Sequence, residues 1–137
     1  MLRFFDTNVL VYLFDASHRQ KKVRASELLE DAVASGDALL STQVLQEFFV
    51  AVTRKLSRPL PHDHAEQAVR ELASLPTVAI DAATVLESIA TMRRYKLSFW
   101  DSLIVRSAIK GGASILYTED LNHGQRIETL TVQNPFV

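Results

Sequence analysis

Four acidic residues occupy comparable places in the sequence. Asp6 and Asp120 each follow a short apolar segment, and Glu47 and Asp101 each lie in the first turns of a segment with helical spacing. Carboxylates packed into one pocket repel each other, and the usual remedies are a raised pKa or a bound cation. If the fold brings the four acids together, they could hold a divalent metal ion.

The other residue types narrow the choice of metal. The chain has no cysteine, and none of its four histidines has the spacing of a zinc site. Carboxylates without thiolates suit hard, oxygen-preferring ions, so the sequence predicts one or two Mg²⁺ or Mn²⁺ ions. Two such ions about 4 Å apart can activate a water and stabilise the leaving oxygen of a phosphodiester. We therefore predict metal-dependent phosphodiester hydrolysis.

Each acid also has an ordinary explanation when it is taken alone. Asp6 could be a turn residue and Glu47 an ordinary helix charge. Asp101 could favour the start of a helix through the helix dipole, and Asp120 could form a solvated loop pair with Glu119. Four acids at four equivalent positions favour a shared site, because several coincidences would otherwise have to occur together.

Short apolar segments alternate with longer segments of helical periodicity along the chain. This alternation predicts an α/β fold, with a central parallel sheet of four to five strands flanked by helices on both faces. In such sheets ligands bind beyond the carboxyl ends of the strands, where the strand order reverses, so the four acids can share one edge. Strands are expected at residues 2–5, 38–40, 77–80 and 114–118, with 129–133 as a last edge strand.

Capping residues indicate where the helices begin. Ser41, Asp81 and Ser98 can cap helices, and Asp63 with Glu66 forms a plausible capping pair. Besides a helical turn after position 6 and a helix after position 81, we expect helices over residues 18–35, 43–56, 63–75 and 99–110. The helix after position 81 is expected to turn four apolar side chains inward: Val85, Leu86, Ile89 and Met92.

Length and composition set the outer limits. The chain has 137 residues, 47% of them hydrophobic and 23% charged, which is typical of one globular domain over residues 1–137. No uncharged run approaches the roughly 20 residues that cross a bilayer, and no signal peptide is visible, so we expect a cytoplasmic location. The 15 basic and 16 acidic residues give a net charge of −1, which argues against binding a polyanion by bulk charge. With four acids assigned to a pocket, 12 acidic residues remain against 15 basic ones, a balance of +3 on the rest of the surface.

Four sequence blocks resemble the motifs of PIN-domain ribonucleases, and more narrowly those of the VapC toxins of type II toxin–antitoxin pairs. Together they cover nearly the whole chain in the expected order, and the third and fourth are the most specific. The blocks are FDTNVL at residues 5–10, QEF at 46–48, LSFWDSLI at 97–104 and YTEDLNHG at 117–124. The resemblance implies a PIN fold, a parallel sheet between helices with an acidic pocket at its carboxyl edge.

The resemblance also implies an activity and partners. The activity would be that of a Mg²⁺- or Mn²⁺-dependent endoribonuclease, which hydrolyses RNA with a metal-activated water and so halts translation. The partners would be a second copy of the chain in a homodimer, and a cognate VapB-like antitoxin whose tail lies in the active-site groove. The family's functional positions fall on the metal-binding and catalytic acids Asp6, Glu47, Asp101 and Asp120, and on the supporting residues Thr7, Asn8 and Thr118.

The third and fourth blocks leave several roles open. Glu119 and Asp120 are adjacent, and position in the motif favours Asp120 as the pocket acid, with Glu119 as a supporting or water-bridged group. His123 could touch the substrate. Trp100 could stack on a base, although packing in the core or at a subunit interface is the commoner role for an aromatic residue there.

Basic residues offer contacts for RNA phosphates. Arg93, Arg94 and Lys96 are the preferred candidates, because the chain runs from them directly into the third acidic block. Two further basic clusters, at residues 19–24 and 54–58, have the same two interpretations, as RNA contacts or as solvated helix faces.

Three other functions deserve comparison with the toxin hypothesis. The chain could be a PIN-like scaffold that binds RNA or protein without catalysis, or a housekeeping RNA-processing nuclease. It could also be an aspartyl-phosphate enzyme built on Asp6. Such phosphatases usually have a second aspartate two residues later, where this chain has Asn8, so the last alternative is disfavoured.

Overall fold

A six-stranded sheet forms the centre of the computed structural model, which describes residues 1–137. The strand order is β3-β2-β1-β4-β6-β5, and every neighbouring pair is parallel except β5 and β6. The chain moves outward from β1 to β3 on one side and continues on the other side of β1 with β4, so the strand order reverses between β1 and β4. The strands are β1 Leu2–Phe5, β2 Ala38–Ser41, β3 Thr77–Val78, β4 Ala113–Tyr117, β5 Arg126–Ile127 and β6 Leu130–Gln133.

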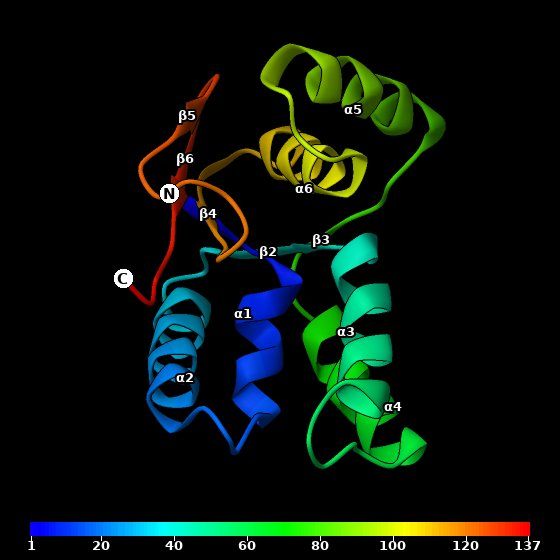
Figure 1. Ribbon diagram of the computed structural model, residues 1–137, viewed down its shortest axis with the longest axis vertical. Coiled ribbons are helices and arrows are strands. Elements are labelled where there is room, and N and C mark those ends of the chain that lie inside the picture. Colours follow the sequence, from blue (N-terminus) through cyan, green and yellow to red (C-terminus); the bar gives the residue numbers. More distant parts are fainter.

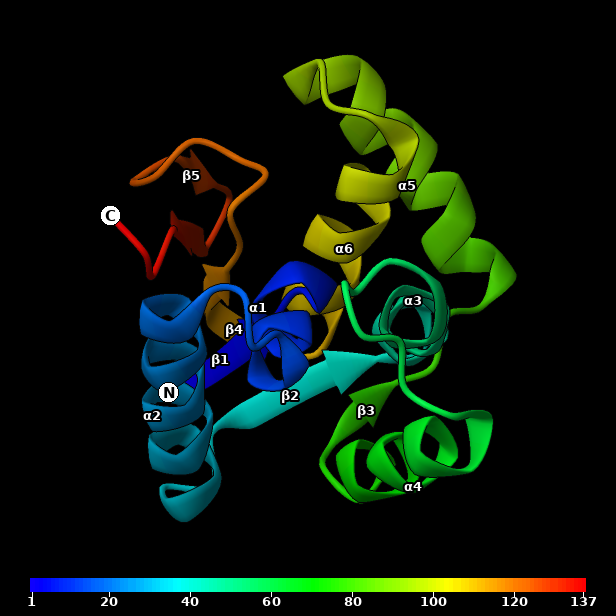
Figure 2. The ribbon, with the colours of Figure 1, turned by 60° about the horizontal axis from the view of Figure 1, so that its bottom comes forward.

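Helices cover both faces of this sheet (Figure 1). The helices α1 to α4 lie on one face, and α5 and α6 lie on the other, an arrangement that Figure 2 shows from a second direction. No helix is long and apolar enough to span a membrane. The helical segments are α1 Thr7–Val11, the 3₁₀ helix η1 Tyr12–Phe14, α2 Arg19–Ala34, α3 Thr42–Arg54, α4 His62–Ala73, α5 Ala82–Tyr95 and α6 Phe99–Lys110.

The α/β class and the helix-flanked, mainly parallel sheet are confirmed, but the sheet has six strands rather than four to five. The additional strand is β5, which has only two residues and pairs antiparallel with β6 across a turn at Glu128, whose φ is 55°. As a result β6 lies inside the sheet, and its prediction as an edge strand was wrong. The strand expected over 77–80 ends at Val78, because the Ile80 amide donates to Thr42 Oγ1 instead of to a neighbouring strand.

Side-chain caps fix the starts of three helices as predicted. Ser41 Oγ accepts from the Val44 amide, Asp81 accepts from the Thr84 amide, and Ser98 Oγ accepts from the Asp101 amide. These bonds satisfy amides that have no partner within the helix.

The capping pair predicted at Asp63 is wrong. The helix α4 starts at His62, immediately after Pro61, so Asp63 already lies in its first turn and no side chain caps it. Glu66 pairs instead with Arg70, one turn later on the same exposed face.

The inward face of α5 is polar and small rather than apolar. Thr84, Ser88 and Thr91 are its buried residues, whereas Leu86 is 68% exposed and its predicted inward orientation was wrong. This helix packs mainly against α6 rather than against the sheet, and small side chains allow the two helices to approach closely. The buried Ser88 hydroxyl is satisfied within its own helix by donating to the Thr84 carbonyl at 2.7 Å.

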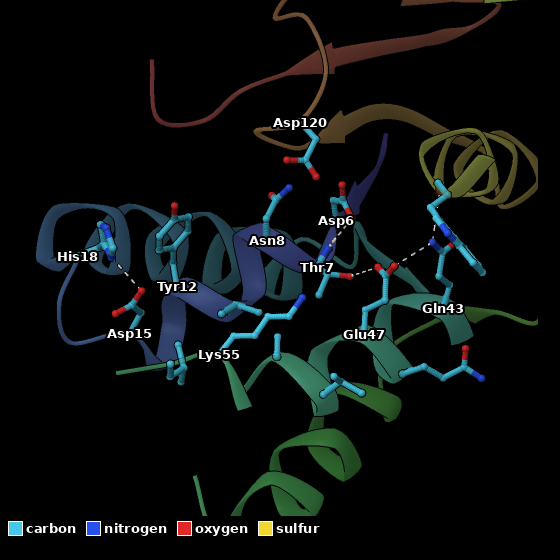
Figure 3. Close-up of a pocket in the computed structure, with 16 residues that line it drawn as sticks. Asp6, Thr7, Asn8, Tyr12, Asp15, His18, Gln43, Glu47, Lys55 and Asp120 are labelled. Carbon is cyan, nitrogen blue, oxygen red and sulfur yellow. Dashed lines mark hydrogen bonds and ion pairs between the residues drawn. The ribbon is translucent and has the colours of Figure 1, made fainter. Parts of the chain in front are cut away.

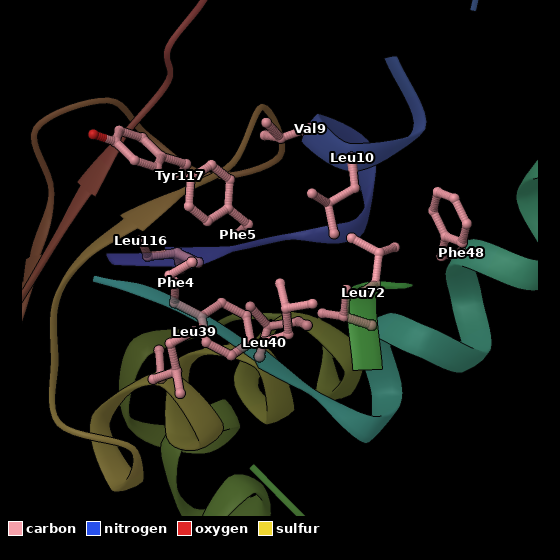
Figure 4. Packing of buried hydrophobic residues seen from close by; sticks show 14 of the residues in the cluster. Phe4, Phe5, Val9, Leu10, Leu39, Leu40, Phe48, Leu72, Leu116 and Tyr117 are labelled. Carbon is pink, nitrogen blue, oxygen red and sulfur yellow. The ribbon is translucent and has the colours of Figure 1, made fainter. Parts of the chain in front are cut away.

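The core fixes β1 against β4, the two strands that flank the reversal point. It contains 26 buried residues, and Phe5 and Tyr117 pack ring against ring with centroids 5.1 Å apart (Figure 4). At the other end of β4, α6 approaches the sheet so closely at Gly111 that a Cβ there would lie 2.5 Å from a Leu39 methyl carbon. The strand ends are therefore held rigidly by packing, which is what a site built on them requires.

Candidate active site

Asp6 lies where β1 ends, beside the end of β4. Phe5 and Tyr117 are paired in the sheet, so the next residues, Asp6 and Thr118, are neighbours. The Asp6 carboxylate accepts from the Thr7 amide at 2.7 Å and from Thr118 Oγ1 at 2.8 Å. Its side chain therefore caps α1 and is held at the reversal point of the sheet.

Burial makes the Asp6 carboxylate hard to ionise. The residue is 5% exposed, and desolvation raises its pKa to about 7. The negative charges of Asp120 and Glu47 contribute to this raised pKa, and the hydrogen bonds from Thr118 and Thr7 partly offset it. An uncompensated negative charge is therefore concentrated around Asp6, which is the condition that a bound cation relieves.

Both carboxylate oxygens of Glu47 are held by neighbouring side chains. Thr7 Oγ1 donates to Oε1 at 2.8 Å, and Gln43 Nε2 donates to Oε2 at 3.2 Å. Gln43 Nε2 also lies 3.3 Å from the Trp100 carbonyl oxygen, so this buried amide connects α3 to the first turn of α6. The sequence interpretation missed Gln43, although its position one turn before Glu47 could have indicated it.

The other two predicted acids lie near this pair. The amide of Asp120 donates to Thr118 Oγ1 at 3.1 Å, so Asp120 is tied to the hydroxyl that also holds Asp6. Asp101 lies in the first turn of α6, and its pKa is raised by burial and by the charges of Asp120 and Glu47. The mutual effects of these carboxylates show that the fold brings all four acids to one region.

Glu119 is turned away from this region. Its carboxylate accepts from Lys21 Nζ at 2.6 Å and from the Tyr12 hydroxyl at 2.7 Å. Its amide donates to Asn8 Oδ1 at 3.3 Å, and Asn8 Nδ2 in turn donates to Thr118 Oγ1 at 3.3 Å. Glu119 thus anchors the loop after β4, and Asp120 is the acid of this adjacent pair that lies beside Asp6.

An elongated cavity of about 710 Å³ opens beside these acids (Figure 3). Asp6, Glu47 and Asp120 line one part of it, and Asp15 and His18 lie at the opposite end. Asp101 is close to the acids but does not line the cavity wall. The other lining residues are Thr7, Asn8, Val11, Tyr12, Gln43, Gln46, Val50, Ala51, Lys55, Leu56 and Trp100.

The family follows from comparison with known sequences. A family model for the PIN domain matches residues 3–126. The chain belongs to the PIN domain family. No curated protein matches the sequence.

Solved structures carry the same PIN fold over nearly the whole chain. A toxin–antitoxin complex from Klebsiella pneumoniae matches with a TM-score of 0.68 and 25% identity, covering 97% of both chains. The structure of FitAB bound to a DNA fragment matches with a TM-score of 0.73 and 21% identity, covering 99% of this chain and 96% of that one. VapC20 of Mycobacterium tuberculosis, a toxin that cleaves the sarcin-ricin loop, matches with a TM-score of 0.65 and 20% identity over 86% and 89%.

The donor set of this PIN domain fits a hard divalent cation. All four acids offer oxygen ligands, and no cysteine is present. No three acidic or histidine side chains are close enough together to enclose an ion by themselves. Mg²⁺ needs no such cage, because it keeps several waters and is usually held by one or two carboxylates. Asp6, Glu47 and Asp120, which line one cavity, supply carboxylates of the kind that such an ion uses.

The basic residues preferred from the sequence lie outside the cavity. None of Arg93, Arg94, Lys96 and His123 lines it. The Arg94 guanidinium lies over the Tyr95 ring at 5.3 Å, and His123 Nδ1 accepts from the Asn134 amide at 3.0 Å. The chain reaches the cavity only at Trp100, so residues shortly before it in the sequence do not line the cavity.

Two residues that were not preferred as RNA contacts line the cavity. Lys55 enters the cavity from the end of α3, although its cluster was not the preferred one. Trp100 is 62% exposed at the cavity wall, so it does not pack in the core of this chain, whereas its packing at a subunit interface stays a prediction.

Proposed function

We propose that this PIN domain is a Mg²⁺- or Mn²⁺-dependent endoribonuclease that acts at Asp6, Glu47, Asp101 and Asp120. The observation that carries the proposal is the convergence of three of these carboxylates on one cavity at the reversal point of the sheet, with Asp101 beside them. Ordinary surface acids repel and separate, whereas the carboxylates of Asp6 and Glu47 are fixed by hydrogen bonds. A cluster held together against its own repulsion is expected where a cation completes the site.

The residues have distinct roles in the proposed hydrolysis. A bound Mg²⁺ or Mn²⁺ supplies a Lewis acid that makes water more acidic and stabilises a leaving oxygen. Asp6 and Asp120 would hold the cation from the strand ends, and Asp6 must lose its proton to do so. Thr7 and Gln43 fix both oxygens of Glu47, which spares the site the cost of ordering that side chain during the reaction.

We further propose that the chain is the toxin of a VapC-like toxin–antitoxin pair. The support is the fold shared over nearly the full chain with a toxin–antitoxin complex, with FitAB and with the toxin VapC20. The corresponding partners would be a VapB-like antitoxin and a second copy of the chain in a homodimer. As an RNA-cutting toxin it would act in the cytoplasm.

A cleavage assay with site variants tests the nuclease proposal. Purified wild-type protein should cut single-stranded RNA with Mg²⁺ or Mn²⁺ and stop when EDTA is added. Asp6→Asn and Asp101→Asn should each reduce the rate on the order of 100-fold or more, the loss expected when a group that stabilises transition-state charge is removed.

The exposed Asp63 on α4 supplies the matched control, since Asp63→Asn removes the same charge away from the cavity. If all three variants cut RNA as fast as wild type, the site assignment is wrong and a contaminating nuclease is the source. A protein that neither cuts RNA nor binds Mn²⁺ in calorimetry would instead be a binding scaffold.

A further inference from the structure

The cavity is much larger than an ion requires. Its volume of about 710 Å³ falls within the roughly 300–1,000 Å³ of pockets that hold whole organic ligands. The acids line one part of it, and Lys55 lies between them and the far end at Asp15 and His18 (Figure 3). The space beyond the acids is therefore part of the same site and is available to the substrate.

Lys55 is the only lysine or arginine among the sixteen lining residues. Figure 3 shows its side chain extended along the cavity toward Thr7 and Glu47. It forms no ion pair with any carboxylate, although every other charged residue lining the cavity is an acid or His18. An unpaired ammonium in a ligand-sized cavity is a contact point for an anionic group of the ligand.

The position of Lys55 relative to Glu47 indicates which anion it would meet. Lys55 follows the last residue of α3 and lies eight residues after Glu47, which is about 12 Å along the helix axis. The Lys55 backbone therefore lies beyond the acids, and its side chain extends back from there toward Thr7 and Glu47 (Figure 3). Its ammonium can meet an anionic group beside the one at the acids. In a nucleic-acid strand that group is the phosphate of a neighbouring nucleotide.

We propose that Lys55 binds a backbone phosphate of single-stranded RNA adjacent to the one being cut, and that the nucleotide between them lies in the cavity. Val11 and Leu56 add apolar side chains to the cavity lining, against which the sugar or base can pack. The proposal rests on the proposed function for the identity of the substrate. It assigns to Lys55 the role that the sequence gave first to Arg93, Arg94 and Lys96.

Equilibrium binding tests this contact. The probe is a fluorescein-labelled, unstructured RNA 12-mer, titrated with Mg²⁺ in the Asp101→Asn background so that cleavage is slow during the measurement. Adding Lys55→Met should weaken binding about tenfold, the loss of one charge-assisted hydrogen bond. It should also reduce the slope of log K against log salt by about 0.7, the value for one single-strand phosphate. Lys55→Arg should retain the binding and the slope.

Lys96→Met is the matched control, because it removes the same charge from a residue outside the cavity. We expect it to leave affinity and slope unchanged. We also expect Lys55→Met to weaken binding of single-stranded DNA of the same sequence equally, since a phosphate contact does not sense the 2′-hydroxyl.

Three results would overturn the proposal. The first is an unchanged RNA affinity in Lys55→Met. The second is a loss of RNA affinity that occurs in Lys96→Met but not in Lys55→Met. The third is a Lys55→Met variant that binds RNA as before but binds an acidic peptide such as hexaglutamate more weakly, which would assign Lys55 to a protein partner. Lys55-dependent binding by a wild-type protein that cuts no RNA would end the nuclease proposal and leave this contact standing.

Discussion

The protonation of Asp6 couples the site to the stability of the fold. Because burial raises its pKa from 3.8 to about 7, the folded state keeps the proton over a pH range in which the unfolded chain has lost it. The folded state therefore binds more protons between these values, and stability falls as the pH rises through that window. Ionisation of the buried Asp6 therefore lowers the stability of the fold, as is common for residues placed for function.

Replacing Asp6 by Asn should remove this cost in the absence of metal. In EDTA at pH 8, Asp6→Asn should melt about 3–5 °C above wild type, the shift that about 1 kcal/mol produces in a domain of this size. The difference should shrink toward pH 5, where the wild-type carboxyl is protonated. Thermal melts followed by circular dichroism between pH 5 and 8 measure it. A difference that stays constant over this range would contradict the raised pKa.

Gln43 is expected to act through Glu47 rather than on the substrate. Gln43→Met keeps the volume of the side chain but removes its hydrogen bonds to Glu47 and the Trp100 carbonyl. Because partners that orient metal ligands matter about 10–100-fold, Mn²⁺ affinity in calorimetry and the rate of RNA cleavage should both fall by such a factor.

Gln46 provides the comparison for Gln43. It lines the same cavity from the same helix but is exposed and makes no side-chain hydrogen bond. Gln46→Met should change Mn²⁺ affinity by less than about threefold, well below the range for residues that orient ligands. Equal losses in the two variants would mean that the bond to Glu47 is not what matters.

Individual residues differ in how far the sequence could reveal them. Asp6 was identifiable because the end of an apolar strand fixes its place in the sheet, whereas Thr7 was identified only through the resemblance to PIN-domain motifs. Gln43 was missed, although its spacing of one turn before Glu47 was a usable signal. Lys55 was considered only within a basic cluster that was not preferred, because its role depends on how far its side chain extends into the cavity. That reach is not encoded in residue type or local spacing.

At the scale of elements, local chemistry predicted helix starts better than helix faces. Ser41, Asp81 and Ser98 cap helices as expected, since a cap is a bond between residues three apart in sequence. The inward face of α5 was predicted only in part: Val85, Ile89 and Met92 are half-buried, but Leu86 is exposed. The fully buried residues of this helix depend on its partner α6, which its local pattern does not reveal. The close approach of these helices selects small residues such as Ser88.

Two substitutions in α5 test this packing. Ser88→Leu should lower the free energy of unfolding by about 1–3 kcal/mol, because it forces extra volume between α5 and α6. Leu86→Gln should change it by less than about 0.5 kcal/mol, since that side chain is largely exposed. Urea titrations measure both. A larger loss of stability in Leu86→Gln than in Ser88→Leu would instead support the apolar inward face that the sequence predicted.

At the scale of the whole molecule, the alternation of strands and helices predicted the class of fold and the edge that holds the acids. The position of β5 was not predictable, because its two residues, which pair with β6 across a turn at Glu128, are too few to show a periodicity.

The distribution of charge is also a property of the whole molecule. The net charge is −1, yet three acidic residues, Asp6, Glu47 and Asp120, line the same cavity. The surface outside it is correspondingly less negative.

This distribution predicts opposite effects of Mg²⁺ and Na⁺ on RNA binding. Na⁺ screens phosphate contacts and should only weaken binding, whereas Mg²⁺ held by the acids should reverse the local field and strengthen it. At constant ionic strength, millimolar Mg²⁺ should raise the affinity of Asp101→Asn for the labelled RNA 12-mer several-fold. Adding Asp6→Asn and Asp120→Asn to this variant should abolish the gain in affinity. In EDTA the resulting triple variant should bind RNA more tightly than Asp101→Asn, because two acidic groups have been removed from the cavity. If Mg²⁺ weakens binding equally in both proteins, the acids do not gather cations for the substrate.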